Sequence, residues 1–399
     1  ECPPPVDEEG TQAPNGGASV ADYGDANLGG AAGADRAGAL GPLRSPRSLG
    51  RTGVVYDPVM ALHVGGPNHP ERPDRITSIW TQLEQQDLVA LCRQYDCRGA
   101  TLSELQAVHT RLHCEQVLAT AGGAAYPEAA SDLYFCNASA EAAAVAAGAL
   151  VDLSLAVLRG EVANGFALIR PPGHHCSDTA PMGFCLYNNI AVAARAAQAH
   201  GAGRVLIVDW DIHHGNGTER IFAEDPSVLF FSVHAHFQGK FYPGTGAAEE
   251  VGTGEGRGFT VNVGWDCSKN TDADYIHVFE RVLLPIARQF NPDLVLVSCG
   301  FDAGLGDPLG RNLVTPEGFA HLLRMLMPLA GGRVVLALEG GYNLSTITYS
   351  AEACVRALLE QEVDPVESPD AVRESTRQKV AEVLEVQRRY WPRALPCEG

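Results

Sequence analysis

The stretch Val205-Leu-Ile-Val-Asp-Trp-Asp-Ile-His-His-Gly-Asn-Gly217 decides the fold class. Its apolar, β-branched start is typical of a strand that is buried on both faces of a parallel sheet. Three more apolar runs resemble it: Ala167-Leu-Ile-Arg170, Leu294-Val-Leu-Val-Ser298 and Val334-Val-Leu-Ala-Leu338. Because helical stretches separate the runs, they predict an α/β sheet of parallel strands, which binds ligands beyond the carboxyl ends of its strands.

Polar residues that can bind a metal or move a proton follow all four runs. They are His174, His175, Asp209, Asp211, His213, Asp302 and Tyr342. Since the carboxyl ends of parallel strands lie at one edge of a sheet, we expect these seven side chains to share one crevice.

The composition bounds the class of protein. The chain has 399 residues, of which 45% are hydrophobic, and this suffices for a large core. A net charge of -19 disfavours direct nucleic-acid binding and favours a cationic, lysine-rich peptide as partner. Eleven cysteines without CxxC pairs predict reduced thiols, no structural zinc finger, and a cytoplasmic or nuclear location. No run of eighteen apolar residues is found, so no membrane span is expected.

The chain divides into three parts. Residues 1–51 are rich in Gly, Ala and Pro and predict a disordered segment. Residues 52–393 are expected to form one domain, followed by a flexible tail at 394–399. A start at Glu1 rather than Met predicts a fragment of a longer protein.

Within the domain, the pattern predicts a first strand at 53–56 and a helix that begins near Pro73. Further helices are expected at 140–159, 190–200, 274–290, 316–330 and about 367–393.

Asp209, Asp211 and His213 alternate along an extended segment, so their side chains should point to the same face. Together with Asp302, the Asp-x-His pair Asp211 and His213 supplies three N or O ligands and leaves coordination positions open, as in a catalytic zinc site. The alternative is that these acidic residues only cap the helices that follow the strands.

The tandem His174-His175 can supply an acid and a base for hydrolysis. Asp209 and Asn216 are the nearest candidates to accept a hydrogen bond from each ring, and this difference would give the two histidines different basicities. Tyr342 follows Gly340-Gly341, and its hydroxyl could stabilise an oxyanion.

The other histidines carry weaker signals. His214 should face away from the metal ligands and be hydrogen-bonded in the wall. His234 and His236 could line the mouth of the site. Surface or packing roles are expected for the rest, namely His63, His109, His113, His200, His277 and His321.

These blocks together resemble the histone deacetylase family, and the agreement runs from about 53 to 358. The motifs that carry the resemblance are His69-Pro-Glu-Arg-Pro73, Arg170-Pro-Pro-Gly-His-His175, Met182-Gly-Phe-Cys185, Asp209-Trp-Asp-Ile-His-His-Gly-Asn-Gly217, Ser298-Cys-Gly-Phe-Asp302 and Glu339-Gly-Gly-Tyr-Asn343. Asn216, Asp307-Pro-Leu-Gly310 and Arg388-Arg-Tyr-Trp391 look more like the class II branch than class I.

The resemblance implies an arginase/deacetylase-like single domain with a central parallel sheet of about eight strands. It also implies hydrolysis of acetyl-lysine, in histones or other proteins, to lysine and acetate. By the same resemblance Asp211, His213 and Asp302 match the zinc ligands. His175 matches the general base and acid, with His174 as its electrostatic partner.

The resemblance further implies roles for the rest of the site. Tyr342 matches the oxyanion tyrosine, and Arg75 matches an arginine linked with acetate handling. The aromatic walls of the substrate channel match Phe184 and Tyr242, where the family more often has Phe at the second position. The expected channel also includes Gly183, Leu309 and Gly340.

Potassium is implied in the same way at one or two positions. The first site would use Asp209, Asp211, His213, Ser232 and the carbonyl of Val233. The second would use mainly backbone groups of Phe222, Asp225, Val228 and Phe259.

Two other functions compete with a protein deacetylase. Relatives that deacetylate polyamines carry an acidic gatekeeper where this chain has Leu309, which favours a peptide substrate. Relatives that act as weakly active acyl-lysine scaffolds replace the tyrosine by histidine, whereas this chain retains Tyr342. Arginase activity is disfavoured because its binuclear site needs more carboxylate and histidine ligands.

Overall fold

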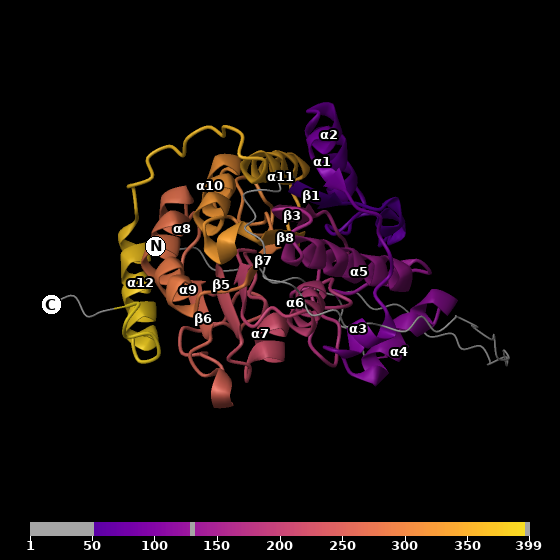
Figure 1. The fold of residues 1–399 in the computed structure, drawn as a ribbon, viewed down its shortest axis with the longest axis horizontal. Coiled ribbons are helices and arrows are strands. Elements are labelled where there is room, and N and C mark those ends of the chain that lie inside the picture. The colour runs from indigo at the N-terminus through magenta and orange to yellow at the C-terminus, as the bar shows by residue number, and fades with distance from the viewer. Residues whose placement is uncertain (1–51, 128–131, 396–399) are drawn as a thin grey trace.

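In the computed structural model, which describes residues 52–127 and 132–395, the apolar runs pair side by side in one sheet (Figure 1). All strand pairs are parallel, and the order is β2-β1-β3-β8-β7-β4-β5-β6. The strands are β1 (Thr52–Val55), β2 (Arg93–Gln94), β3 (Asn164–Ala167), β4 (Val205–Asp209), β5 (Val228–Ala235), β6 (Thr260–Trp265), β7 (Leu294–Cys299) and β8 (Val334–Leu338). The expected single α/β domain with an eight-stranded parallel sheet is confirmed.

Helices cover both faces of the sheet (Figure 1). The helices are α1 (Asp74–Gln85), α2 (Leu88–Leu91), α3 (Leu102–Gln106), α4 (Arg111–Ala119), α5 (Ser139–Leu158), α6 (Asn189–Ala199), α7 (Asn216–Phe222), α8 (Asp272–Val278), α9 (Leu284–Phe290), α10 (Pro316–Leu326), α11 (Leu344–Leu358) and α12 (Glu374–Gln387). Helices α5 and α6 pack together and contact the central strands, whereas α11 packs beside α1 and α10 on the opposite side. Because both faces are covered, the central strands are apolar at nearly every position.

Most predicted elements are present with shifted boundaries. The predicted strand at 167–170 is wrong in its position, because β3 ends at Ala167. Leu168 and Ile169 are fully buried although they lie beyond the paired segment, so hydrophobicity continues past the end of the strand. The predicted helix at 367–393 is shorter, since α12 ends at Gln387. The predicted helix at 274–290 consists of α8 and α9 joined by a π-helical turn at Phe279–Leu283.

Helix α5 is long and apolar enough to cross a membrane by length and composition, with a mean hydropathy of 1.8. The expectation of no membrane span came from the lack of eighteen consecutive apolar residues, and α5 contains Glu141 and Asp152 among its apolar residues. Since 83% of its apolar window is buried against the rest of the protein, α5 is a core helix here.

The C-terminal segment closes the β6 edge of the sheet. Helix α12 contacts β6, and the Trp391 indole donates a hydrogen bond to the carbonyl of Gly258 at 2.7 Å. Packing continues to Leu395, which is 5% exposed, so the tail predicted from 394 is wrong for its first two residues. The segments at 1–51 and 396–399 lie outside the described residues. The nine cysteines in the described ranges are free.

Candidate active site

The carboxyl ends of β4 and β7 bring three side chains together as a candidate metal centre. One ligand atom from each of Asp211, His213 and Asp302 lies within 4.8 Å of the other two. Nδ1 of His213 is 3.1 Å from Oδ1 of Asp211 and 3.1 Å from Oδ2 of Asp302. Both carboxylates are fully buried, as are the neighbouring Trp210 and Ile212, which point into the core.

The electrostatics of this cluster favour a cation. Burial and the negative charge of Asp211 raise the pKa of Asp302 to about 7. Two carboxylates in a buried site are costly unless a positive charge lies between them. The oxygens of the two carboxylates and the ring nitrogen of His213 lie close together, and this donor set fits a divalent metal such as zinc.

Backbone groups fix the two carboxylates. The amide of Gly340 donates to Oδ2 of Asp211 at 2.8 Å, and the amide of Ile212 donates to Oδ1 of Asp302 at 2.8 Å. A Cβ at Gly340 would lie 2.3 Å from Oδ2 of Asp302 and 2.5 Å from Oδ2 of Asp211. Glycine is thus required there by close approach to both carboxylates.

The histidine pair lies beside this cluster. Nδ1 of His174 is 2.9 Å from Oδ2 of Asp209, and Nδ1 of His175 is 2.8 Å from Oδ1 of Asn216. The sequence predicted these two partners. The ring centroids of His174 and His175 are 4.0 Å apart, and His175 lies 5.9 Å from the ring of His213.

The two rings differ in acid–base character. Burial lowers the pKa of His174, but the charges of Asp209 and Asp211 outweigh burial and raise it well above its ordinary value. For His175, burial and the positive charges of His174 and His213 lower the pKa well below its ordinary value. At neutral pH the structure therefore places a charged imidazole next to a neutral one.

Tyr342 lies at the start of α11. Its neighbour Asn343 caps this helix, because the Asn343 side chain accepts a hydrogen bond from the amide of Thr346. The amide of Tyr342 donates to Oδ2 of Asp307 at 2.7 Å. Its ring is 6.0 Å from the ring of Phe184, and burial raises the pKa of its phenol well above the ordinary value.

The aromatic residues expected at the channel gather around the histidines. The ring of Tyr242 lies 5.2 Å from that of His175 and is 40% exposed. Gly183 packs so closely that a Cβ there would lie 2.3 Å from the imidazole of His175. Leu309 is half-buried, in the loop that follows Asp302.

No motif pointed to Asp132, which joins these walls. Its Oδ2 accepts hydrogen bonds from the Tyr242 hydroxyl at 2.8 Å and from the amide of Gly183 at 3.1 Å. Its Oδ1 is buried without a partner. An isolated aspartate remote in sequence from both partners has no motif that could have identified it.

Arg75 is fully buried behind Tyr342, and its guanidinium carbon lies 5.2 Å from the centre of the phenol ring.

Glu339 begins the motif Glu339-Gly-Gly-Tyr-Asn343, but the sequence predicted no role for its side chain. It is fully buried, and its Oε2 accepts hydrogen bonds from the amides of Gly173 and His174 at 2.7 and 3.2 Å.

The residues expected at the first potassium site lie at the end of β4, just after it, and on β5. Those expected at the second site lie between the end of α7 and the start of β5, and directly before β6. Ser232 is the register partner of Asp209, and its hydroxyl is 2.8 Å from Nδ1 of His234. Val233 follows in the same strand. Phe222, Asp225 and Val228 are linked by backbone hydrogen bonds, and the carbonyl of Phe259 accepts one from Phe230.

His214, His234 and His236 each lie near polar protein groups. His214 faces away from the metal cluster, as expected, and contacts Thr245 and Glu219 at 2.8 and 2.9 Å. The expectation that His234 lines the mouth is wrong, since this residue is fully buried and also contacts the carbonyl of Gly246. His236 is mostly buried, with Asp266 at 4.0 Å.

A second group with metal-ligand chemistry consists of His109, His113 and Cys176. All four ring nitrogens already have hydrogen-bond partners, namely Ser177 O, Asn188 N, Tyr126 Oη and Leu186 O. Both histidines are therefore held within the fold by protein groups, which fits the surface or packing roles expected of them.

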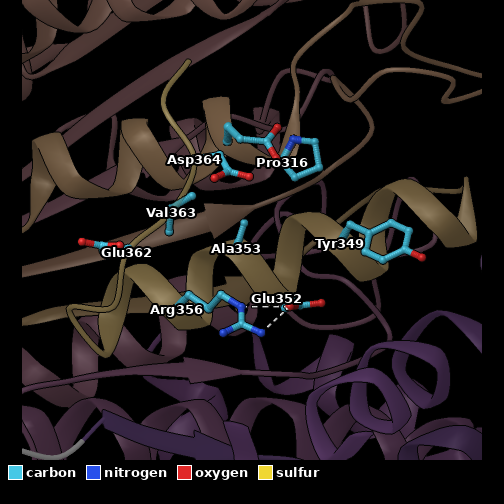
Figure 2. A pocket seen from close by; sticks show the side chains of 9 residues that line it. Pro316, Tyr349, Glu352, Ala353, Arg356, Glu362, Val363 and Asp364 are labelled. Carbon is cyan, nitrogen blue, oxygen red and sulfur yellow. Dashed lines mark hydrogen bonds and ion pairs between the residues drawn. The ribbon is translucent and has the colours of Figure 1, made fainter. Parts of the chain in front are cut away.

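A hollow of about 530 Å³ lies apart from these catalytic candidates, between the start of α10, the middle of α11 and the segment after α11 (Figure 2). Its charged side chains include Glu317, Glu352, Arg356 and Asp364. An ion pair of 2.7 Å between Arg356 and Glu352 satisfies its single arginine. No residue of the candidate active site lines it.

Known proteins share this sequence and architecture. A family model described as the histone deacetylase domain matches residues 69–358. Histone deacetylase 15 of Arabidopsis thaliana is 47% identical over 355 residues, which cover 87% of this chain and 64% of that protein. Histone deacetylase 7 of Homo sapiens is 41% identical over 383 residues, which cover 85% of this chain and 40% of that protein.

The crystal structure of the HDA15 HD domain superposes with a TM-score of 0.82 at 46% identity, covering 86% of this chain and 96% of that one. This chain spans less than two thirds of the length of the curated relatives named above. The family model, in contrast, matches more than half of the chain and contains the motifs at all four strand ends. The chain belongs to the histone deacetylase family.

Proposed function

We propose that this chain is a zinc-dependent lysine deacetylase of the class II type, which hydrolyses acetyl-lysine in proteins to lysine and acetate. The observation that carries this proposal is the convergence of three metal-ligand side chains, Asp211, His213 and Asp302, beside two histidines of opposite acid–base character.

Asp211, His213 and Asp302 would hold the zinc ion. Zinc bound there would supply Lewis-acid chemistry, polarising the amide carbonyl and making water a better nucleophile. The fixed carboxylates orient the ligand set before substrate arrives, because backbone amides already hold one oxygen of each.

The two histidines divide the proton transfer. His175 donates its Nδ1 proton to Asn216, so its Nε2 is a free acceptor that can take a proton from the attacking water. As the C–N bond breaks, His175 returns this proton to the leaving lysine nitrogen. His174 stays charged through its hydrogen bond to Asp209 and stabilises the negative charge that develops nearby.

Tyr342 would donate its phenolic proton as a hydrogen bond to the oxyanion of the tetrahedral intermediate. Phe184 and Tyr242 would enclose the lysine methylenes with their flat rings, next to Gly183 and Gly340. Arg75, buried behind Tyr342, would contact the departing acetate.

Further assignments rest on the resemblance and the positions of the residues. Potassium would bind near Asp209 and Ser232 and, at a second site, near Phe222 and Asp225. The preferred partner is an acetylated peptide or protein, and the location is nuclear, cytoplasmic or both. Leu309 favours a peptide over an acetylpolyamine, because its side chain cannot attract a second ammonium group.

Metal content and turnover together test the proposal. The purified chain should contain one zinc ion and release acetate from an acetyl-lysine peptide, and a chelator should abolish this activity. His213→Ala should lose both zinc and turnover, whereas His200→Ala, at an exposed position, should retain both. Stoichiometric zinc that survives His213→Ala unchanged would rule out this ligand set.

A further inference from the structure

A buried carboxylate, Glu71, lies between two buried arginines behind the candidate active site. Its Oε1 and Oε2 accept hydrogen bonds from Nε and Nη2 of Arg170, each at 2.8 Å. Oε1 also accepts one from Nη1 of Arg75 at 3.2 Å. All three side chains are 0% exposed, so water cannot replace any of these contacts.

The charge of Glu71 is secure at neutral pH. Burial opposes ionisation, but the positive charges and hydrogen bonds of Arg170 and then Arg75 lower the pKa of Glu71 to about 2. One negative charge therefore separates two guanidinium groups that would otherwise repel each other in a buried space.

Arg75 links Glu71 to the loop before Tyr342. Its Nε donates to the carbonyl of Gly341 at 2.7 Å, and its Nη2 donates to the carbonyl of Glu339. These two carbonyls flank Gly340, so Arg75 holds the backbone from which Tyr342 projects. The same guanidinium lies beneath the Tyr342 ring.

Arg170 links Glu71 to the loop that bears His174 and His175. It directly precedes Pro171-Pro-Gly-His-His175, and its Nη1 donates to the carbonyl of Met60 at 2.5 Å. A doubly hydrogen-bonded arginine has a fixed plane, which sets where the histidine loop begins.

Tyr134 links Glu71 to the aromatic wall of the channel. The hydroxyl of Tyr134 donates to Oε2 of Glu71 at 2.5 Å. The ring of Tyr134 is 4.5 Å from that of His69, which in turn is 4.7 Å from Phe184. One carboxylate thus contacts groups that support the histidine loop, the tyrosine loop and the aromatic wall.

We propose that Glu71 is a positioning residue for deacetylation, which holds the His174-His175 loop and the Tyr342 loop in register through Arg170 and Arg75. This inference rests on the proposed function. Replacing Glu71 by Gln turns one acceptor oxygen into a donor that faces guanidinium donors and leaves the two arginines without their shared negative charge. The loops should then shift while the metal ligands stay in place.

The test compares wild type with Glu71→Gln at full zinc loading. In Glu71→Gln, kcat should fall about 10- to 100-fold, as is typical when groups that orient an active site are removed. KM should stay within about threefold, because Phe184 and Tyr242 are unchanged and Glu71 reaches Phe184 only through Tyr134 and His69. The effect should also be non-additive with Tyr342→Phe, since adding Glu71→Gln to that variant should cost less than it costs wild type.

Glu104→Gln is the matched control. Glu104, on helix α3 and outside the active site, accepts two hydrogen bonds of 2.7 Å from Arg98. Its replacement removes an arginine–carboxylate pair, and kcat should stay at the wild-type value. An unchanged kcat in folded, zinc-loaded Glu71→Gln, or a loss that multiplies fully with Tyr342→Phe, would overturn the inference.

A second variant covers the case in which Glu71→Gln does not fold. Tyr134→Phe removes a single hydroxyl from the same carboxylate and keeps both arginine pairs, so kcat should fall about threefold with KM retained. Wild-type kcat in Tyr134→Phe would then overturn the inference. A wild-type chain that does not deacetylate any peptide would instead contradict the proposed function.

Discussion

Two adjacent histidines differ in basicity because each ring faces a different partner. The carboxylate of Asp209 stabilises the charged form of His174, and the amide oxygen of Asn216 carries no charge that could do the same for His175. The positive charge of His174 then disfavours a second one 4.0 Å away. Acid–base roles at this site are therefore set by side chains beyond the histidines themselves.

The hydroxyl of Tyr342 should matter for turnover and not for folding. Tyr342→Phe removes one preorganised donor and keeps the ring between Phe184 and Arg75. We expect turnover on an acetyl-lysine peptide to fall about 100- to 1000-fold, or about 3–4 kcal/mol, with unchanged zinc content and melting temperature. Full turnover by this variant would contradict the role of Tyr342 as the oxyanion donor.

The gatekeeper position should control the choice between peptide and polyamine. Leu309→Glu introduces a carboxylate at a half-buried position that could attract a distal ammonium by roughly 1 kcal/mol. Specificity constants for an acetyl-lysine peptide and for acetylspermidine should shift towards the polyamine in Leu309→Glu. A wild-type preference for acetylspermidine would contradict the proposed substrate class.

At the scale of elements, the site exists because parallel strands end at one edge of the sheet. Metal-ligand residues follow β4 and β7, and Tyr342 follows β8 and precedes α11, whose cap is the next residue, Asn343. Helix N-termini and strand ends therefore define the positions of catalytic loops within a few residues.

The indole of Trp391, which follows α12, should stabilise the domain. Trp391 is 6% exposed and packs against Phe259 and Phe290 with centroid distances of 5.4 and 6.5 Å. Trp391→Ala should lower the free energy of unfolding by about 3–5 kcal/mol in urea titrations. Arg389→Ala, at an exposed position, should change it by less than about 0.5 kcal/mol; equal effects of the two would show that α12 is not docked in solution.

At the scale of the whole molecule, buried neutral histidines make the fold sensitive to acid. Burial lowers the pKa of His63 to about 4 despite the nearby charge of Glu71, and burial with the charge of His113 lowers the pKa of His109 to about 3. Since the unfolded chain binds these protons first, the stabilisation is complete above about pH 6.5 and is lost as the pH falls towards 4.

Unfolding free energies measured in urea should therefore decrease between pH 7 and pH 5, and His63 alone should account for a loss on the order of 3 kcal/mol by pH 4. His63→Asn should flatten this dependence, and His200→Asn, at an exposed position, should not. A free energy of unfolding that is constant across this range would contradict neutral, buried histidines.

Much of the site could be predicted from the sequence because its residues come in short local motifs. Within each motif the residues are adjacent or alternate, and each motif follows its own strand within a few positions, so local spacing indicated the chemistry. Asn216 and Asp209 were predicted as partners of the histidines because each lies near a strand end that the motifs had already located.

Contacts between distant segments depended on the tertiary structure. Asp132 meets Tyr242 across 110 positions, and Glu71 meets Arg170 across 99, and neither carboxylate lies in a spacing that predicts its partner. The end of β3 and the burial of His234 were mispredicted for a related reason. An apolar run indicates that a segment is buried, but it does not indicate where strand pairing ends or in which direction a neighbouring polar side chain points. The fold class, the family and the candidate site residues could be predicted from the amino-acid order, because each is carried by a local pattern. Only the packing of loops from separate strands decided which charges face each other, because electrostatic interactions depend on distances in space and not on separation along the chain.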